Sequence, residues 1–87
     1  MKRYAVTLDR NARKQLRAIR DPRLRDALEA DINALADNPR PPGCIKMSGP
    51  ADDWRIRVGD WRVVYRLDDG RVVVVVVRVA PRGGVYR

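Results

Sequence analysis

Along the first half of the chain, apolar residues recur with the period of an α-helix. Residues 3–8 precede this pattern and predict a short strand, because Tyr, Val and Thr favour the extended backbone. Asp9 can cap a first helix, and Asp21-Pro22 predicts the start of a second, since proline is tolerated at the first helical position. The apolar stripes are Ala12, Leu16 and Ile19 in the first helix and Leu24, Ala27, Leu28, Ile32 and Leu35 in the second. Asn38-Pro39 ends the second helix. Because only one or two residues join the two helices, we expect them to fold back on each other as an αα-hairpin.

In the second half of the chain the period changes to two, which is typical of β-strands. Residues 40–53 contain five Pro and Gly residues and predict an irregular loop. Residues 54–58 alternate strictly, a Gly-Asp pair predicts a two-residue turn, and residues 61–67 return as a second strand. Residues 71–80 include six consecutive valines, which predict a central strand covered on both faces. Residues 80–87 predict a loop, with a short final strand as the alternative.

These elements predict one α+β domain over residues 1–87 with the order β-α-α-β-β-β. An N-terminal strand precedes the αα-hairpin, which packs on one face of a small antiparallel sheet. A chain of 87 residues supports one hydrophobic core and not two. The other face of the sheet is left carrying arginines, and this asymmetry is the most informative feature of the sequence.

The net charge and the absence of some residue types limit the kinds of site that the chain can form. The chain has 19 Lys and Arg against 11 Asp and Glu, a formal net charge of +8, which favours a polyanionic partner. It has no His, which removes the usual general base near neutral pH and every His-containing metal site. The lone Cys44 cannot form an internal disulfide and has no His to activate it. We therefore expect a basic cytoplasmic domain with no metal, no cofactor and no membrane segment.

Arginines at alternating positions of the first hairpin strand are the main candidate site. Arg55 and Arg57 project from the same face, about 6–7 Å apart along the strand. Arg62 and Arg66 on the next strand share one side with each other, and Arg62 is close enough to converge with the first pair on one ligand. Like charges that face each other across strands destabilise a sheet, so an anionic ligand is the simplest compensation. The alternative is that these arginines form the solvated side of a half-buried sheet.

The aromatic residues divide into two groups. Trp54, Trp61 and Tyr65 alternate with the arginines, which predicts the core side of the sheet, although tryptophans can also stack on bases. Tyr86 follows a Gly-Gly pair near the end of the chain. There it could stack on a base or donate a phenolic proton, with packing of the chain terminus as the alternative.

The run Trp54-Arg-Ile-Arg-Val-Gly-Asp-Trp-Arg-Val-Val-Tyr65 resembles the central hairpin of the RelE/ParE toxin superfamily. Asn38-Pro-Arg-Pro-Pro-Gly43 and Lys46-Met-Ser-Gly49 resemble it too, and the resemblance covers nearly the whole chain. In one branch, the RelE-like mRNA interferases, it implies a ribosome-dependent endoribonuclease that cleaves messenger RNA in the A site. The implied reaction is attack of a 2′-hydroxyl on the adjacent phosphate, which leaves a cyclic phosphate and a 5′-hydroxyl.

The resemblance also implies site residues. Its catalytic pattern falls on Arg55, Arg57, Arg62, Arg82 and Tyr86. We expect Arg57, Arg62, Arg82 and Tyr86 to be catalytic, and Arg55, Arg57 and Arg66 to bind RNA phosphates. The first-strand pair is commonly Lys in the best-known members and is Arg here. Because arginine stays protonated, Arg57 would clamp phosphorane charge and would be a poor general base.

The partners implied by the resemblance are the ribosome, messenger RNA and a cognate antitoxin with an acidic or amphipathic inhibitory segment. Toxin and antitoxin would form a heterodimer or a heterotetramer, with DNA bound only through the antitoxin. Two alternatives stay open. One is a ParE-like DNA gyrase poison without nuclease activity, and the other is a non-enzymatic nucleic-acid-binding module.

Overall fold

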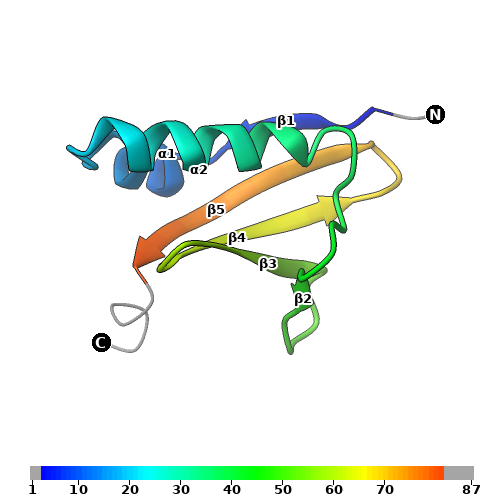
Figure 1. Cartoon of the computed structure of the whole chain (residues 1–87). Coiled ribbons are helices and arrows are strands. Elements are labelled where there is room, and N and C mark those ends of the chain that lie inside the picture. Colours follow the sequence, from blue (N-terminus) through cyan, green and yellow to red (C-terminus); the bar gives the residue numbers. More distant parts are fainter. Residues whose placement is uncertain (1–2, 82–87) are drawn as a thin grey trace.

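The computed structural model, which describes residues 3–81, has two helices and five strands (Figure 1). The elements follow the predicted order, with one extra short strand after the helices. In chain order they are β1 (Ala5–Leu8), α1 (Arg10–Arg17), α2 (Pro22–Ala34), β2 (Ile45–Lys46), β3 (Asp53–Val58), β4 (Trp61–Asp68) and β5 (Val73–Pro81). Arg82 and Tyr86, both predicted site residues, lie outside the described residues.

The strands form a single sheet in the order β1-β5-β4-β3-β2. β2, β3, β4 and β5 pair antiparallel, whereas β1 pairs parallel with β5. The sheet is therefore mixed, and the prediction of an antiparallel sheet was wrong for β1. The direction of β1 was not visible in the sequence, because its partner lies more than sixty residues further along the chain.

Both helices begin where the capping residues predict. The Asp9 carboxylate accepts a hydrogen bond from the Ala12 amide at 2.8 Å, and Asp21 accepts one from Arg23 at 3.0 Å. The αα-hairpin covers one face of the sheet, as expected (Figure 1). One member of the predicted apolar stripe, Ala27, is exposed, so the stripe of α2 is narrower than the sequence suggested.

The core lies between the helices and the covered face of the sheet. Tyr65 is fully buried, and Trp54 and Trp61 pack partly buried against the core, which confirms their predicted side. The other core side chains come from both helices, the residues that follow them, and the central strands: Ala12, Ile19, Leu28, Ile32, Leu35, Ile56, Val58, Val63, Leu67, Val74, Val76 and Val79.

The valine-rich strand differs from its prediction in three ways. β5 starts at Val73 and not at residue 71, because Val72 takes a φ of 60° in the preceding turn. Val77 has no residue opposite it on β4, and this bulge lets Val79 return to the core side. β5 is central in the sheet, but the helices cover only one of its faces, so Val75 and Val77 are half-buried on the open face.

The stretch at residues 40–53, predicted to be an irregular loop, contains β2. Its two residues pair with Arg55 and Trp54 of β3, and this pairing ties the loop to the edge of the sheet. Among residues 3–81, no helix is long and apolar enough to cross a bilayer.

Candidate functional site: an arginine-lined hollow

The β3–β4 hairpin holds the arginines at alternating positions. It forms as predicted, because Gly59 provides the φ of 60° that its two-residue turn needs. The register places Arg57 directly opposite Arg62, and Arg55 opposite Val64. Since their neighbours in the strands are buried under the helices, the three arginines leave the opposite, open face of the sheet.

We call the depression that these side chains line the arginine hollow. Its volume is about 260 Å³, and it is lined by Gly43, Ile45, Arg55, Ile56, Arg57 and Arg62. None of these lining residues, all within the described chain, is acidic. Arg57 donates a hydrogen bond from Nε to the carbonyl oxygen of Gly59 at 3.1 Å, which holds its guanidinium beside the turn. Several planar donors around one depression suit a phosphate, which guanidinium groups bind with paired hydrogen bonds.

The wall formed by Gly43 and Ile45 was missed by the sequence reasoning. Pairing of Ile45 with Arg55 brings this wall beside the hollow. Gly43 has a φ of 88°, in the region that favours glycine, and the Ile45 side chain is 50% exposed. The available signal was Ile45 itself, the one β-branched residue in residues 40–53, because β-branched residues favour strands.

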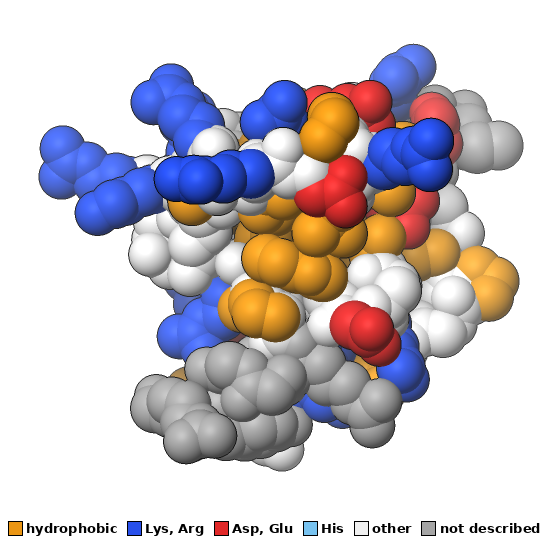
Figure 2. Space-filling view, turned by 60° about the vertical axis from the view of Figure 1, so that its left-hand side comes forward, with side chains coloured by type: hydrophobic (Ala, Val, Ile, Leu, Met, Phe, Trp, Pro, Cys, Tyr) orange, Lys and Arg blue, Asp and Glu red, His pale blue; other side chains and the backbone are white. Residues whose placement is uncertain are grey.

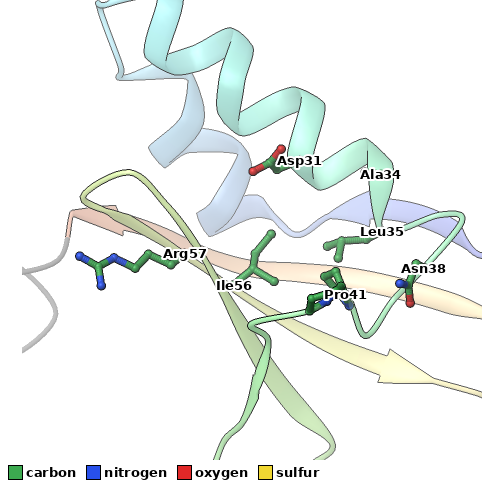
Figure 3. Close-up of a pocket in the computed structure, with 8 residues that line it drawn as sticks. Asp31, Ala34, Leu35, Asn38, Pro41, Ile56 and Arg57 are labelled. Atoms are coloured by element: carbon green, nitrogen blue, oxygen red, sulfur yellow. The ribbon is translucent and has the colours of Figure 1, made fainter.

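A second cavity, of about 240 Å³, lies on the covered side of β3 (Figure 3). Its walls come from the C-terminal half of α2, the loop at residues 38–42 and β3. Ile56 points toward α2 in this view, whereas the Arg57 side chain extends away from the helix. Both residues line this cavity and the arginine hollow, so the two depressions adjoin at this part of β3.

Arg66, a predicted phosphate-binding residue, is held by a carboxylate. Its Nε lies 2.8 Å from Asp53 Oδ1, and its Nη2 lies 3.3 Å from Oδ2. The hydrogen bond to Asp53 raises the pKa of Arg66 above its ordinary value. Arg66 does not line the arginine hollow, so the structure brings together three of the four described candidates and leaves the fourth in an ion pair.

A second cationic surface lies on the helical layer. Figure 2 shows Lys and Arg side chains extending over this part of the molecule above a band of hydrophobic side chains. On α1 the exposed basic residues are Arg10, Arg13, Lys14 and Arg17. No ion pair joins these four to an acidic side chain within residues 3–81. The described residues also contain no group of three or more Cys, Asp or Glu that could hold a metal ion.

Comparison with known proteins assigns the chain to a family. The model of the ParE toxin family, the toxin of the type II toxin–antitoxin system parDE, matches residues 6–86. The comparison with curated proteins found no match.

Similar solved structures come from toxin–antitoxin complexes. A chain of the RelE–RelB complex from the archaeon Pyrococcus horikoshii is 26% identical, with a TM-score of 0.81 over 92% of this chain and 96% of that one. A chain of the toxin–antitoxin complex RelBE2 from Mycobacterium tuberculosis is 30% identical, with a TM-score of 0.79 over 94% of each chain. The isolated RelE toxin of E. coli is 28% identical, with a TM-score of 0.77 over 90% of this chain and 83% of that one.

The match to the family model spans nearly all of the chain, and the similar structures cover most of their own length. The chain therefore belongs to the ParE toxin family, within the RelE/ParE superfamily of type II toxin–antitoxin toxins.

Proposed function

We propose that this toxin is a RelE-like endoribonuclease that cleaves messenger RNA in the ribosomal A site. The observation that carries the proposal is the arginine hollow, in which Arg55, Arg57 and Arg62 line one depression that has no carboxylate among its lining residues. The similarity of the chain to RelE toxins, at 26–30% sequence identity, supports the same function. A hollow of this kind can hold an RNA phosphate and the charge that develops on it during cleavage.

In this proposal each residue of the hollow has a distinct role. Arg62 contacts the scissile phosphate and stabilises the added negative charge of the phosphorane. Arg55 and Arg57 hold the backbone on either side, and the Arg57–Gly59 hydrogen bond fixes one of them. Outside the described residues, Arg82 assists the leaving 5′-oxygen and Tyr86 stacks on or orients a nucleotide.

In the reaction one phosphorus–oxygen bond forms and another breaks. The 2′-oxygen loses its proton and attacks the adjacent phosphorus, while the 5′-oxygen leaves and takes up a proton. The chain has no His, and arginine stays protonated at every accessible pH. We therefore expect the single-turnover cleavage rate to lack a His-like inflection between about pH 5 and pH 8. A clear inflection there would mean that a group outside this scheme transfers the proton.

A ParE-like poison of DNA gyrase is the second candidate, and the match to the ParE family model favours it. It uses the same scaffold without cutting RNA, so the fold does not choose between the two. A non-enzymatic nucleic-acid-binding module would use the same basic face, but it would not arrest growth.

For either toxin we propose a cognate antitoxin as partner. The Pyrococcus and Mycobacterium relatives were solved as toxin–antitoxin complexes. An acidic or amphipathic inhibitory segment would complement the cationic open face, in a heterodimer or heterotetramer whose DNA binding comes from the antitoxin.

Induction of the toxin in cells, followed by mapping of messenger ends, tests the proposal. Breaks at A-site codons that disappear in Arg62→Ala support the nuclease. A DNA damage response without such breaks supports the gyrase poison instead. Arg71→Ala is the matched control, because it removes an equally charged but 85% exposed side chain whose ion pair with Asp68 spans 3.9 Å.

A further inference from the structure

Arg40 anchors a cluster of charges away from the arginine hollow. Its Nη2 lies 2.9 Å from Asp69 Oδ2 and 3.8 Å from Asp52 Oδ2, and its guanidinium lies 5.1 Å from the centre of the Trp54 ring. The Tyr4 hydroxyl donates a hydrogen bond to the same Asp69 carboxylate. The cluster therefore joins the segment before β1, the α2–β2 loop, the β2–β3 loop and the β4–β5 turn.

The direction of the pKa shifts agrees with this geometry. The Arg40 guanidinium, followed by the Tyr4 hydroxyl, holds the pKa of the Asp69 carboxyl below its usual range. The bond to Asp69 in turn raises the pKa of Tyr4, which keeps this hydroxyl a donor. The carboxylate is thus the common acceptor that keeps Arg40 in place.

Arg40 belongs to the loop whose other end forms a wall of the arginine hollow. The Tyr65 hydroxyl donates a hydrogen bond to the carbonyl oxygen of Pro39 at 2.7 Å, and the Arg40 amide donates one to Asn38 Oδ1 at 3.2 Å. Burial raises the pKa of Tyr65, so this donor keeps its proton. The peptide group that precedes the Arg40 side chain is therefore held at both its carbonyl and its amide.

The segment between this anchor and the hollow is stiff. Residues 41 and 42 are both proline, whose ring restricts φ to about −65°. The Cys44 amide then donates to the Pro41 carbonyl oxygen at 3.0 Å and closes a turn. Gly43 and Ile45, which line the hollow, follow at once. A displacement of Arg40 is carried along these residues because few of their torsions can absorb it.

A second route to the hollow runs through Trp54. Its Nε1 donates to Asp52 Oδ1 at 2.8 Å, and its ring lies under the Arg40 guanidinium. The next residue on β3 is Arg55, which lines the hollow and pairs with Ile45. Both routes therefore end at the same corner, where the loop wall meets Arg55.

We propose that Arg40, held by Asp69, is a positioning residue that sets the wall of the arginine hollow through the Pro41-Pro42 segment and Trp54. Arg40 does not line the hollow, so it acts on RNA binding only through these neighbours. The consequence for RNA rests on the proposed function, whereas the consequence for the shape of the hollow does not.

The decisive variant is Asp69→Asn, because electrostatics and loss of the Arg40 anchor predict opposite changes in its affinity for RNA. The substitution adds one unit of positive charge, so electrostatics alone predicts tighter binding of RNA. Loss of the Arg40 anchor predicts binding about five- to tenfold weaker. Asp37→Asn is the matched control, since it makes the same charge change at a 70% exposed carboxylate that pairs with Arg3 at 3.8 Å.

The probe is a short single-stranded RNA with a 2′-deoxy substitution at the cleavage position, titrated by fluorescence anisotropy at several salt concentrations. We expect weaker binding for Asp69→Asn and unchanged or tighter binding for Asp37→Asn. Equal or tighter binding by Asp69→Asn would overturn the proposal. If Asp69→Asn does not fold, Arg40→Lys serves instead, since it keeps the charge but loses the planar fork, and we expect it to weaken binding about threefold.

Nuclear magnetic resonance separates failure of this proposal from failure of the proposed function. In the free protein, Asp69→Asn should shift the amide signals of Gly43 and Ile45 and the Nε–Hε signal of Arg55, whereas Asp37→Asn should leave all three in place. These shifts support positioning even if the wild type binds no RNA. Their absence refutes it even if the wild type cleaves RNA.

Discussion

Two arginines on the same face of β4 stand opposite different residues of β3. Arg62 and Arg66 are four residues apart on β4 and both leave the open face. Arg62 faces Arg57 on β3, and the two line the arginine hollow, whereas Arg66 faces Asp53 and forms an ion pair with it at 2.8 Å. The alternation of a strand determines the face of a side chain, but register determines what stands opposite it.

The comparison separates a site for a ligand from a structural pair. Arginines opposite one another repel across the strands, so an anion placed between them relieves a cost that the fold carries. Arg66 forms an ion pair with Asp53 and must give it up before it can bind a phosphate. We therefore expect substitutions at Arg57 and Arg62 to change RNA cleavage and the salt dependence of RNA binding differently from substitutions at Arg66.

The largest effect should come from Arg62→Ala. Removing one preorganised donor of transition-state charge typically costs about 10²–10³ in rate. Single-turnover cleavage of ribosome-bound messenger RNA should fall by that factor, whereas Arg66→Ala should change it less than about fivefold. Thermal unfolding of both variants checks that the fold is intact. Cleavage by Arg62→Ala near the wild-type rate would remove the hollow as the catalytic site.

Arg57→Glu would give Arg62 a carboxylate partner across the strands, like the one that Arg66 has. The new carboxylate would stand opposite Arg62, as Asp53 stands opposite Arg66. Like-charge repulsion across β3 and β4 becomes attraction, so stability should rise by about 0.2–1 kcal/mol while RNA binding weakens.

The salt dependence of RNA binding by Arg57→Glu shows how many phosphate contacts are lost. For single strands, log K falls with log salt by about 0.7 per phosphate contact, so loss of two contacts should flatten the slope by about 1.4. A slope equal to that of the wild type would show that Arg57 and Arg62 do not touch phosphate. Arg71→Ala should leave the slope unchanged.

Asp53→Ala is the reverse experiment, and its effect should be smaller. It releases Arg66 from its counterion and leaves two half-buried neighbours on the open face, Val64 and Val75, undisturbed. One additional phosphate contact should steepen the salt slope by about 0.7. An unchanged slope would mean that Arg66 lies outside the path of the RNA, contrary to its predicted role in phosphate binding.

Features of the fold and of the site could be predicted from the sequence where neighbouring residues determine them. The helices were predictable because Asp9 and Asp21 cap them within three residues. The β3–β4 turn was predictable for the same reason, since Gly59 alone permits it. The three arginines of the hollow could be placed together because a two-residue turn fixes the register around it.

Two of the features that the sequence did not reveal depend on contacts between distant segments: the parallel pairing of β1 with β5 and the Arg40–Asp69 pair. The β2–β3 pairing is nearer in sequence, but β2 has only two residues, which is too short for an alternating pattern to show. The ion pair of Arg66 with Asp53 was missed for a simpler reason. Asp53 was assigned to the loop before β3, although the strand pairs one residue further than its alternation suggested.

The smallest effect is on the pH dependence of stability, and it should distinguish the charge cluster around Arg40 from the arginine hollow. Arg40 lowers the pKa of Asp69 in the folded state, so the stabilisation is complete above the pKa of the unfolded carboxyl, about 3.9, and is lost as pH falls through the lower folded value. Arg62→Ala leaves the Asp69 carboxyl and its partners unchanged, so it should not alter this dependence. Thermal unfolding followed from about pH 6 to about pH 2 should show a shallower acid decline for Asp69→Asn than for the wild type, and the same decline for Arg62→Ala as for the wild type. Parallel curves for Asp69→Asn and the wild type would show that the cluster forms equally well with a neutral residue at this position, and the anchor assigned to Arg40 would then need another partner.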